Sequence, residues 1–475
     1  MGQPGRASPA GHVRAHRVAC LLVTGLLITG LFASRHFTTG LLVTRLLVAH
    51  LFVSRVLVTR VLVIHFHITR LRLATRPRAP PGVVVALTAE RRDLRDAVRR
   101  LIAKTSSGQG QPSTTGADRS PWRRLCDDIG VAGLAIPERY GGVGAGLAEV
   151  CVVMEELGRD LTPSPILGSA VFAAQAVLAS GDDAACRRLL PAIAVGSSIA
   201  ALAWTTSAGR WDVAELAYDA REARGSSAGG SGSGGSSAAG GEWKLDGEAH
   251  YVLDGDAADV LLVAARTPDG SGLFEVNPSQ AGVARARVAT MDTSRSLAAV
   301  RLAGAAGRRI GGDAARPLAF ARDQACIALS AEQVGAAARA LELTVEHLLT
   351  RVQFGQPIGS FQALQHRAAD LHVLVESARS LARAVASAED GADGAEPASA
   401  LGSDPDRGLR AAAAKVYCSE TLTRTASEMI QLHGAIGVTW EHQAHRYLKR
   451  AHGGRYLFGS PATHLATIAA NLIDQ

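Results

Sequence analysis

Two long runs of apolar residues at helical spacing, separated by a short break, constrain the fold of this chain more than any other feature. Residues 327 to 352 and 364 to 385 place Ile, Val, Leu and Ala three, four or seven positions apart. This spacing keeps the apolar side chains on one face of an α-helix. Because the break at residues 355 to 361 is short, the two helices should pack antiparallel.

The remaining C-terminal residues continue the helical pattern. Residues 407 to 433 predict a third helix after a Gly/Asp/Pro-rich loop at residues 389 to 406. Ser460 followed by Pro461 predicts the start of a fourth helix, because Pro is favoured at the first helical position. Four helices of this kind predict a four-helix bundle over residues 313 to 475.

The chain of 475 residues is long enough for two or three domains, and its pattern changes ahead of the bundle. Residues 83 to 197 predict a helical domain, which begins with a helix over residues 87 to 104 that has Thr88 as its N-cap. A second helix should have Ser120 as its N-cap and end at Gly130, because glycine favours the left-handed C-cap conformation.

Residues 198 to 312 predict a small β domain. Short runs rich in Val, Leu and Ala are separated there by Asp-Gly and Asn-Pro turn signals. A Gly/Ser-rich stretch at residues 225 to 241 indicates a flexible insertion. Its G-x-G-x-x-G match is a chance match, because no strand precedes it and no helix follows. The fold class is therefore α+β, with an N-terminal helical domain, a central small β-barrel or β-sandwich domain and a C-terminal four-helix bundle.

Residues 1 to 82 form a low-complexity extension in which residues 21 to 70 run in tandem pentads such as LLVTG and VLVTR. A period of five matches neither the helix period of 3.6 nor the strand period of 2, so no single buried face results. We expect this extension to lie outside the fold. Two alternatives are a targeting or membrane-tethering segment at residues 18 to 34, and a translated nucleotide repeat upstream of a true start near residues 83 to 85.

Charge and cysteine content argue against two kinds of site. Residues 1 to 82 hold eleven Arg and no Lys, Asp or Glu, so the remaining residues carry a net charge of −4 although the whole chain carries +7. A mildly acidic body argues against nucleic acid as a partner. The six Cys are scattered without a C-x-x-C pair or a His/Cys cluster at metal spacing. We therefore expect no metal site, and reduced thiols in a cytoplasmic protein.

The break between the first two bundle helices carries candidate ligand-binding residues. It reads Arg351-Val-Gln-Phe-Gly-Gln-Pro-Ile358, so an Arg stands at the end of a long helix that Gly and Pro then break. A guanidinium held in this way offers a fixed fork of positive donors to an anionic pyrophosphate. Gln362 opens the next helix and Gln431 closes a later one, while Gly434 and Gly437 allow a ligand to approach the backbone closely.

This pattern resembles the flavin-binding signature of the acyl-CoA dehydrogenase family. The resemblance covers about residues 86 to 475, and it also includes residues 133 to 142 (GLAIPERYGG), Asp246-Gly247 with Tyr251, and residues 291 to 295 (MDTSR). It implies a helical, β and four-helix architecture with FAD between the β domain and the bundle. It also implies an oligomer, at least a dimer, in which signature residues reach the FAD of a neighbouring subunit.

The resemblance implies cofactor-binding roles for particular residues. The adenine dinucleotide part of FAD would contact Arg351, Phe354, Gln362, Gln431 and Gly434. Thr205 and Tyr251 would lie near the isoalloxazine ring, where Tyr251 replaces the usual Trp and preserves stacking. The loop that begins at Thr205 departs from the family pattern, and Leu253 replaces a Thr of the second flavin strand. We therefore expect FAD binding that is weakened on this side.

The chemistry of the family needs a base that removes the proton next to the thioester carbonyl while FAD accepts a hydride from the neighbouring carbon. In family members this base is a Glu, and the resemblance places Phe458 at its position. At the alternative position used by some relatives stands Ala325. Neither side chain can accept a proton. Asp323 is the nearest substitute, although its alternative role is a charge that the dipole of a helix N-terminus stabilises.

Three functional hypotheses remain open. The leading one is an acyl-CoA dehydrogenase-like flavoprotein that dehydrogenates an acyl-CoA thioester at its α and β carbons in a bacterial degradative pathway. Fatty acids and bulky or steroid side chains are both candidate acyl groups. The resemblance implies electron-transferring flavoprotein as its electron acceptor. The alternative is a noncatalytic FAD-binding partner subunit of a heteromeric acyl-CoA dehydrogenase, and the missing Glu favours it. The Phe-Gly-Ser-Pro end at residues 458 to 461 is similar to actinobacterial members that pair with a base-bearing subunit. The third hypothesis is a membrane-tethered protein.

Overall fold

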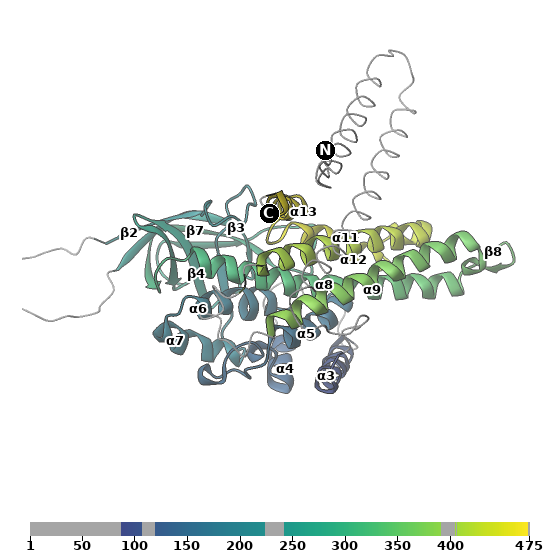
Figure 1. Cartoon of the computed structure of the whole chain (residues 1–475), viewed down its shortest axis with the longest axis horizontal. Helices are drawn as coiled ribbons and strands as arrows, with labels where there is room; N and C mark the ends of the chain where they lie inside the picture. Colours follow the sequence, from purple (N-terminus) through teal and green to yellow (C-terminus); the bar gives the residue numbers. More distant parts are fainter. Residues whose placement is uncertain (1–86, 107–118, 224–241, 391–403, 405, 474–475) are drawn as a thin grey trace, which may run out of the picture. The chain divides into compact units, whose positions relative to one another are not determined.

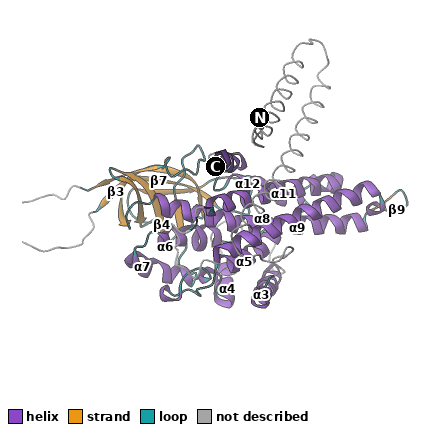
Figure 2. Ribbon diagram, viewed as in Figure 1, coloured by secondary structure: helices purple, strands orange, loops and turns teal. Residues whose placement is uncertain are grey.

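The computed structural model describes residues 87–106, 119–223, 242–390, 404 and 406–473 (Figure 1). Three sequence-based expectations lie outside these residues: the pentad-repeat extension with its alternatives, the Gly/Ser-rich insertion with its G-x-G-x-x-G match, and most of the loop before the third bundle helix. The described residues form many helices and one larger β-sheet, so the fold is of the α+β class (Figure 2).

The N-terminal part is helical, as predicted. Its helices are α3 (Ala89–Ser106), α4 (Ser120–Ile129), the 3-10 turns η2 (Val131–Gly133) and η3 (Glu138–Tyr140), α5 (Leu147–Arg159), the π-helix η4 (Ile166–Ala173), α6 (Ala174–Ala179) and α7 (Asp183–Ala194). Thr88 is the N-cap of α3, because its Oγ1 accepts a hydrogen bond from the N–H of Arg91 at 3.3 Å. Gly130 ends α4 with a φ of 75°, as predicted. The predicted N-cap of α4 is wrong by one residue, since Arg119 occupies the cap position and Ser120 begins the helix.

The central region is a closed β-barrel with two added strands. The strands are β1 (Ala200–Ala203), β2 (Tyr218–Glu222), β3 (Trp243–Leu253), β4 (Val260–Thr267), β5 (Gly270–Val276), β6 (Val283–Arg287) and β7 (Leu297–Ile310). Pairing runs from β4 through β2, β3, β7 and β5 and returns to β4, which closes the barrel, while β1 pairs with β4 and β6 with β7. Tyr218, Leu245 and Phe274 fill its interior. The structure therefore favours the barrel over the sandwich.

The C-terminal part is a helical bundle. Its elements are α8 (Ala315–Thr350), the hairpin strands β8 (Val352–Gln353) and β9 (Gln356–Pro357), the 3-10 turn η5 (Ile358–Ser360), α9 (Gln362–Asp390), α11 (Arg407–His433), the 3-10 turn η6 (Gly434–Val438), α12 (Ala444–Tyr456) and α13 (Pro461–Ile473). Helix α11 packs against α8, α9, α12 and α13. The hairpin and η5 join the two longest helices, as the helical spacing predicted.

Two details of the predicted bundle need correction. The sequence analysis missed α12, which inserts a helix between α11 and the predicted fourth helix, α13. The predicted loop at residues 389 to 406 begins too early, because α9 continues to Asp390. Contacts hold this last turn in place: Glu389 pairs with Arg407 at 2.6 Å, and Asp390 accepts a hydrogen bond from the Leu147 N–H at 2.7 Å.

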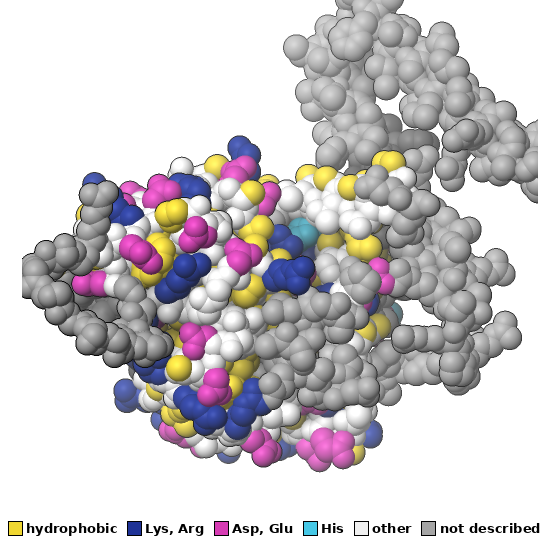
Figure 3. Space-filling view, turned by 60° about the vertical axis from the view of Figure 1, so that its left-hand side comes forward, with side chains coloured by type: hydrophobic (Ala, Val, Ile, Leu, Met, Phe, Trp, Pro, Cys, Tyr) yellow, Lys and Arg dark blue, Asp and Glu magenta, His cyan; other side chains and the backbone are white. Residues whose placement is uncertain are grey.

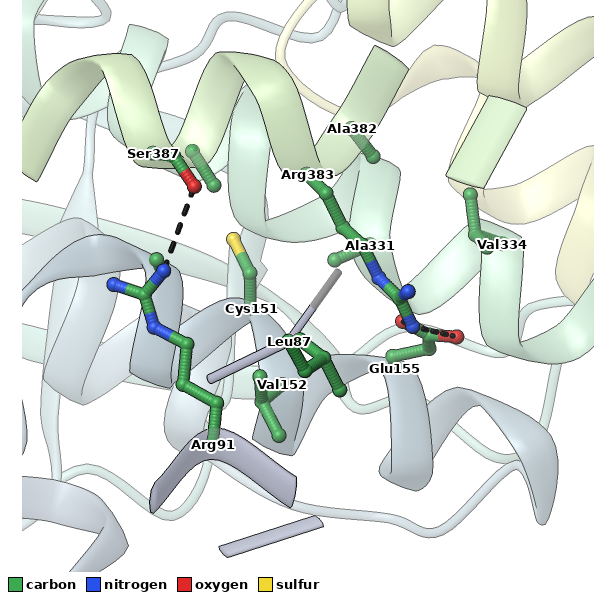
Figure 4. A pocket seen from close by; sticks show the side chains of 12 residues that line it. Leu87, Arg91, Cys151, Val152, Glu155, Ala331, Val334, Ala382, Arg383 and Ser387 are labelled. Atoms are coloured by element: carbon green, nitrogen blue, oxygen red, sulfur yellow. Dashed lines mark hydrogen bonds and ion pairs between the residues drawn. The ribbon is translucent and has the colours of Figure 1, made fainter. Parts of the chain in front are cut away.

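The N-terminal helices share a hydrophobic core with the barrel and the bundle. Val153, Leu262 and Ala328 belong to the same buried cluster although they lie on α5, β4 and α8. The limits of the three predicted domains therefore remain predictions. Between α3, α5, α8 and α9 lies a small cavity, across which Arg91 points toward Ser387 (Figure 4). Its volume of about 20 Å³ has room for a single water molecule, so it is a packing gap.

None of the described helices is both long and apolar enough to cross a bilayer. Acidic and basic side chains are interspersed on the face that Figure 3 shows. The described cysteines are buried and free. Burial raises the pKa of Cys326 to about 12, which keeps this thiol protonated and unreactive.

Candidate functional site

The predicted site residues fall into two groups at different ends of the bundle. Arg351, Phe354, Gln362, Gln431 and Gly434 lie at the ends of α8 and α11 and the start of α9, and we call this group the signature end. Thr205, Tyr251 and Phe458 lie beside the β-barrel. In Figure 1 the hairpin at the signature end and the sheet occupy opposite ends of the long helices. One chain therefore does not assemble all the predicted contacts around a single ligand.

The signature end presents its polar residues to solvent. Arg351 is the C-cap of α8, where its own N–H donates to the His347 carbonyl at 2.9 Å and its carbonyl accepts from the Ile358 N–H at 2.8 Å. This places the guanidinium just outside the helix, next to the hairpin. Phe354, at the tip of that hairpin, has a φ of 56° and is 91% exposed. A non-glycine residue with positive φ is strained, and such strain is concentrated at functional sites.

Three stacked imidazoles hold the parts of the signature end together. The ring of His433 lies 4.4 Å from that of His347 and 4.3 Å from that of His442. Burial lowers the pKa of each of the three groups, so they stay neutral at neutral pH. The stack joins the last turn of α8 to the last turn of α11, and therefore brings Arg351 and Gln431 to the same end of the bundle.

A cleft of about 470 Å³ lies between barrel loops and α12, and we call it the barrel cleft. This volume is within the range of small-molecule sites. The described residues in its wall include Trp211, Tyr251, Met291, Asp292, Arg295 and Tyr456. Aromatic and apolar side chains predominate over a few polar groups, which suits a planar ring system.

The residues predicted to lie near a flavin ring fit such a group. Tyr251 lines the barrel cleft, is 37% exposed and has a φ of 58°. Its hydroxyl donates to the Ser207 carbonyl at 3.4 Å. The Oγ1 atom of Thr205 is buried and has no hydrogen-bond partner among the described residues. A buried hydroxyl without a partner costs stability. Thr205 is only 1% exposed and is not one of the described residues that line the barrel cleft, so its predicted contact with the ring stays a prediction.

Buried ion pairs form the floor of the barrel cleft. Arg295 contacts both carboxylate oxygens of Glu332 at 2.6 and 2.7 Å. Arg450 lies 3.2 Å from Glu332 and 3.3 Å from Asp292. Burial raises the pKa of Asp292, but Arg450 and the Ser294 hydroxyl outweigh it, so the pKa lies below its ordinary value. Asp292 is the one carboxylate among the described lining residues, and it is ionised and paired instead of free to act as a base.

Phe458 is part of the core and does not line the cleft. It is 1% exposed, and its ring lies 5.0 Å from the rings of both Phe172 and Trp211. Its backbone has a φ of 60°, and its carbonyl contacts the His464 Nε2 atom at 3.1 Å. Ala325, at the alternative base position, is fully buried. Apolar packing therefore fills the positions where the family resemblance placed a base.

Asp323 remains an untested candidate base. Burial raises the pKa of its carboxyl group, which is a property of general bases. However, its oxygen pairs with Arg322 at 3.2 Å, and the side chain faces Arg407 and Gly408 at the start of α11. It is not one of the described residues that line the barrel cleft.

Sequence reasoning missed the part of the cleft that α12 supplies. His452, Gly453, Tyr456 and Leu457 line the cleft, but without a prediction of α12 they had no assigned place. Asp292 and Arg295 were noticed as part of a family motif, although no role was assigned to them. The only signal in the sequence was the presence of two charged residues of opposite sign within a turn-rich segment.

Comparisons with known proteins point to one family. Models described as "Acyl-CoA dehydrogenase, N-terminal domain" and "Acyl-CoA dehydrogenase, C-terminal domain" match residues 88–197 and 319–473. The chain is 36% identical to acyl-CoA dehydrogenase IpdE2 of Mycobacterium tuberculosis over 385 residues, which cover 78% of this chain and 94% of that protein.

Matches to solved structures point to the same family. A variant of the Tcur3481–Tcur3483 steroid ACAD is 30% identical with a TM-score of 0.68, and the match covers 81% of this chain and 98% of that chain. The ChsE4–ChsE5 complex from Mycobacterium tuberculosis is 27% identical with a TM-score of 0.68, and the match covers 82% and 99%.

Proposed function

Because the chain belongs to the acyl-CoA dehydrogenase family, we propose that it is an FAD-binding subunit of a heteromeric acyl-CoA dehydrogenase in which a related chain supplies the catalytic base. One observation carries this choice: the side chain at the family's base position, Phe458, is packed between Phe172 and Trp211. Loss of a general base costs a factor of about 10² to 10⁴ in rate, so the lone chain should dehydrogenate acyl-CoA poorly.

The reaction is the α,β-dehydrogenation of an acyl-CoA thioester. A base removes the α proton, and bound FAD supplies the acceptor for the β hydride. In this chain Tyr251 and Trp211, which line the barrel cleft, would flank the flavin ring. The Thr205 hydroxyl, which is buried behind the cleft wall without a partner among the described residues, would bond a polar atom of the ring after a small movement of the wall. These residues bind and orient the cofactor, and the apolar wall excludes water from it. The proton transfer belongs to the partner chain.

The signature end would contact the partner chain and the FAD bound there. Its predicted contact residues are exposed, and so are the apolar residues Val352, Val438 and Trp440 beside them. Exposed apolar residues next to a charged group indicate a surface that another chain covers. We propose that Arg351, Gln431 and their neighbours hold the adenine dinucleotide part of FAD across this interface.

Substrate and electron acceptor follow from the relatives. Two of the similar solved structures are named as a steroid ACAD and as a complex of two chains, ChsE4 and ChsE5. We therefore propose an acyl-CoA thioester with a bulky steroid-derived acyl group as the substrate, and electron-transferring flavoprotein as the acceptor of electrons.

A complete dehydrogenase that uses Asp323 as its base is the second candidate. The observation in its favour is the raised pKa of this buried carboxyl group. Two observations argue against this candidate: Asp323 pairs with Arg322, and it is not one of the described residues that line the barrel cleft. A base must reach the proton that it removes.

The decisive experiment compares the chain alone with the chain co-expressed with a related, Glu-bearing acyl-CoA dehydrogenase subunit of the same organism. Flavin absorbance is followed anaerobically after a panel of acyl-CoA thioesters is added. We expect bleaching only in the complex. Rapid bleaching by the lone chain would overturn the subunit proposal, and loss of that bleaching in Asp323→Asn would establish the second candidate.

A further inference from the structure

A fully buried lysine stands behind the barrel cleft. Lys415 lies in the middle of α11 and is 0% exposed, although lysine is among the residues least often buried. Its Nζ atom makes three hydrogen bonds of 3.0 Å each, to the Ser419 hydroxyl and to the carbonyls of Gly454 and Arg455. All three ammonium protons therefore have an acceptor.

The two carbonyls belong to the last turn of α12. A helix leaves its last four carbonyls without partners inside the helix, and a cation near that end is also stabilised by the helix dipole. Residue Leu457, which follows α12, is in an extended conformation with a ψ of 136°. Lys415 thus caps α12 from a neighbouring helix.

This last turn forms one wall of the barrel cleft. Gly453, Tyr456 and Leu457 line the cleft, and Phe458 follows at once in its strained conformation. The Gln333 amide nitrogen, which donates to the Ser419 hydroxyl, also packs against this turn at Gly454. A movement of the turn would therefore move the cleft wall.

We propose that Lys415 is a positioning residue of the barrel cleft: its hydrogen bonds fix the last turn of α12 and so set the orientation of Tyr456 and Leu457 toward a bound flavin. The inference deepens the proposed function and rests on it for the identity of the ligand. The placement of the turn itself depends only on the contacts of this chain.

A buried cation at this place is costly to desolvate, and removing it would take a donor from the Ser419 hydroxyl and from two carbonyls of α12. Burial lowers the pKa of Lys415 to about 8, because desolvation of the ammonium outweighs the stabilisation that its neighbours provide. The charged and titratable groups that face it are Cys326 of α8, Cys418 and Glu420 of α11, Arg455 of α12 and His464 of α13.

The test compares Lys415→Met with Lys449→Met in the full chain. Lys449 lies on α12 itself, but its Nζ atom stands over the Trp440 ring at 4.3 Å, and it is not one of the described residues that line the cleft. Three quantities are measured: amide hydrogen exchange over residues 452 to 458, the dissociation constant of FAD, and stability in urea.

In Lys415→Met we expect protection of these amides to fall roughly tenfold or more, and the dissociation constant of FAD to rise about tenfold, because hydrogen bonds to a charged donor are lost. We expect the urea midpoint of Lys415→Met to fall as well, because buried acceptors lose their donor, and Lys449→Met to match the wild type in all three quantities. Unchanged protection in a folded Lys415→Met protein would overturn the proposal.

If Lys415→Met does not fold, the wild-type chain supplies the test. Exchange is measured between pH 7 and 9.5 and corrected for its intrinsic pH dependence. Deprotonation of Lys415 removes a donor, so protection should fall over residues 452 to 458 and stay constant in the centre of α9. A uniform response would overturn the proposal. Failure of the wild-type chain to bind FAD would instead count against the proposed function, since the exchange result does not depend on the flavin.

Discussion

Two phenylalanines in the same backbone conformation show how the two regions of the site differ. Phe354 and Phe458 have φ angles of 56° and 60°, yet the first is 91% exposed and the second 1%. Phe354 stands at the signature end, among exposed polar residues and without cover in the described chain. Phe458 is enclosed by aromatic rings beside the barrel cleft. The proposed cofactor-binding surface is therefore exposed, while the position where the family resemblance placed a base lies in the core.

The largest effect on stability is expected when the Phe458 ring is truncated, and truncation of the Phe354 ring provides the comparison. Phe458→Ala should lower the free energy of unfolding by about 3 to 5 kcal/mol, because it leaves a cavity between Phe172 and Trp211. Phe354→Ala should leave the stability of the lone chain unchanged and weaken its association with a partner chain. Urea unfolding and analytical ultracentrifugation measure the two quantities. Equal losses of stability in both variants would contradict the assignment of Phe458 to the core and of Phe354 to an exposed surface.

The next effect is a pH dependence of stability that originates at His464, next to Phe458. Burial lowers the pKa of His464, which contacts the Phe458 carbonyl, to about 4. The unfolded state therefore binds more protons between pH 6.5 and 4, so stability present above pH 6.5 is lost as the pH falls toward 4. Protonation of His464 should lower the free energy of unfolding by about 3 kcal/mol over this pH range. Urea unfolding of the wild type and of His464→Gln should show a flatter profile in the variant, and parallel profiles would contradict the assignment.

A smaller effect is expected at the signature end. In the heteromeric complex Arg351→Gln should weaken FAD binding by about 10- to 100-fold, because a charged donor to the pyrophosphate is lost. The lone chain should keep its stability, since the side chain is exposed. Arg339→Gln, on the same helix but paired with Glu342 and Glu346, is the matched control. FAD affinity that falls equally in both variants would place the cofactor elsewhere.

The signature end was largely predictable because its elements follow from local sequence. The spacing of apolar residues predicted α8 and α9, and glycine and proline predicted the break between them. Gln362 begins α9, as expected. These features depend on residues that are close together in the chain, so the helical spacing of apolar residues is enough to predict them.

The barrel side was less predictable because long-range contacts define it. Helix α12 has only 13 residues, with a Gly-Gly pair and several charged side chains, so its sequence carries a weak helical signal. The buried side chains of Tyr447 and Ala451 and the contact with Lys415 hold it in place. Phe458 packs against Phe172, which is nearly 300 residues earlier. Sequence reasoning predicted Phe458 at the family's base position, but only the structure shows that its ring packs against Phe172 and Trp211.

Exchange of the α hydrogen of an acyl-CoA thioester in D₂O reports whether the lone chain carries a base, because this exchange needs a base but no oxidation. The FAD-loaded lone chain and its complex with a Glu-bearing partner are incubated with the same thioester, and exchange is followed by NMR. If the partner chain supplies the base, exchange occurs with the complex and stays at background with the lone chain. Rapid exchange by the lone chain would show that it carries its own base and would overturn the assignment of the proton transfer to the partner.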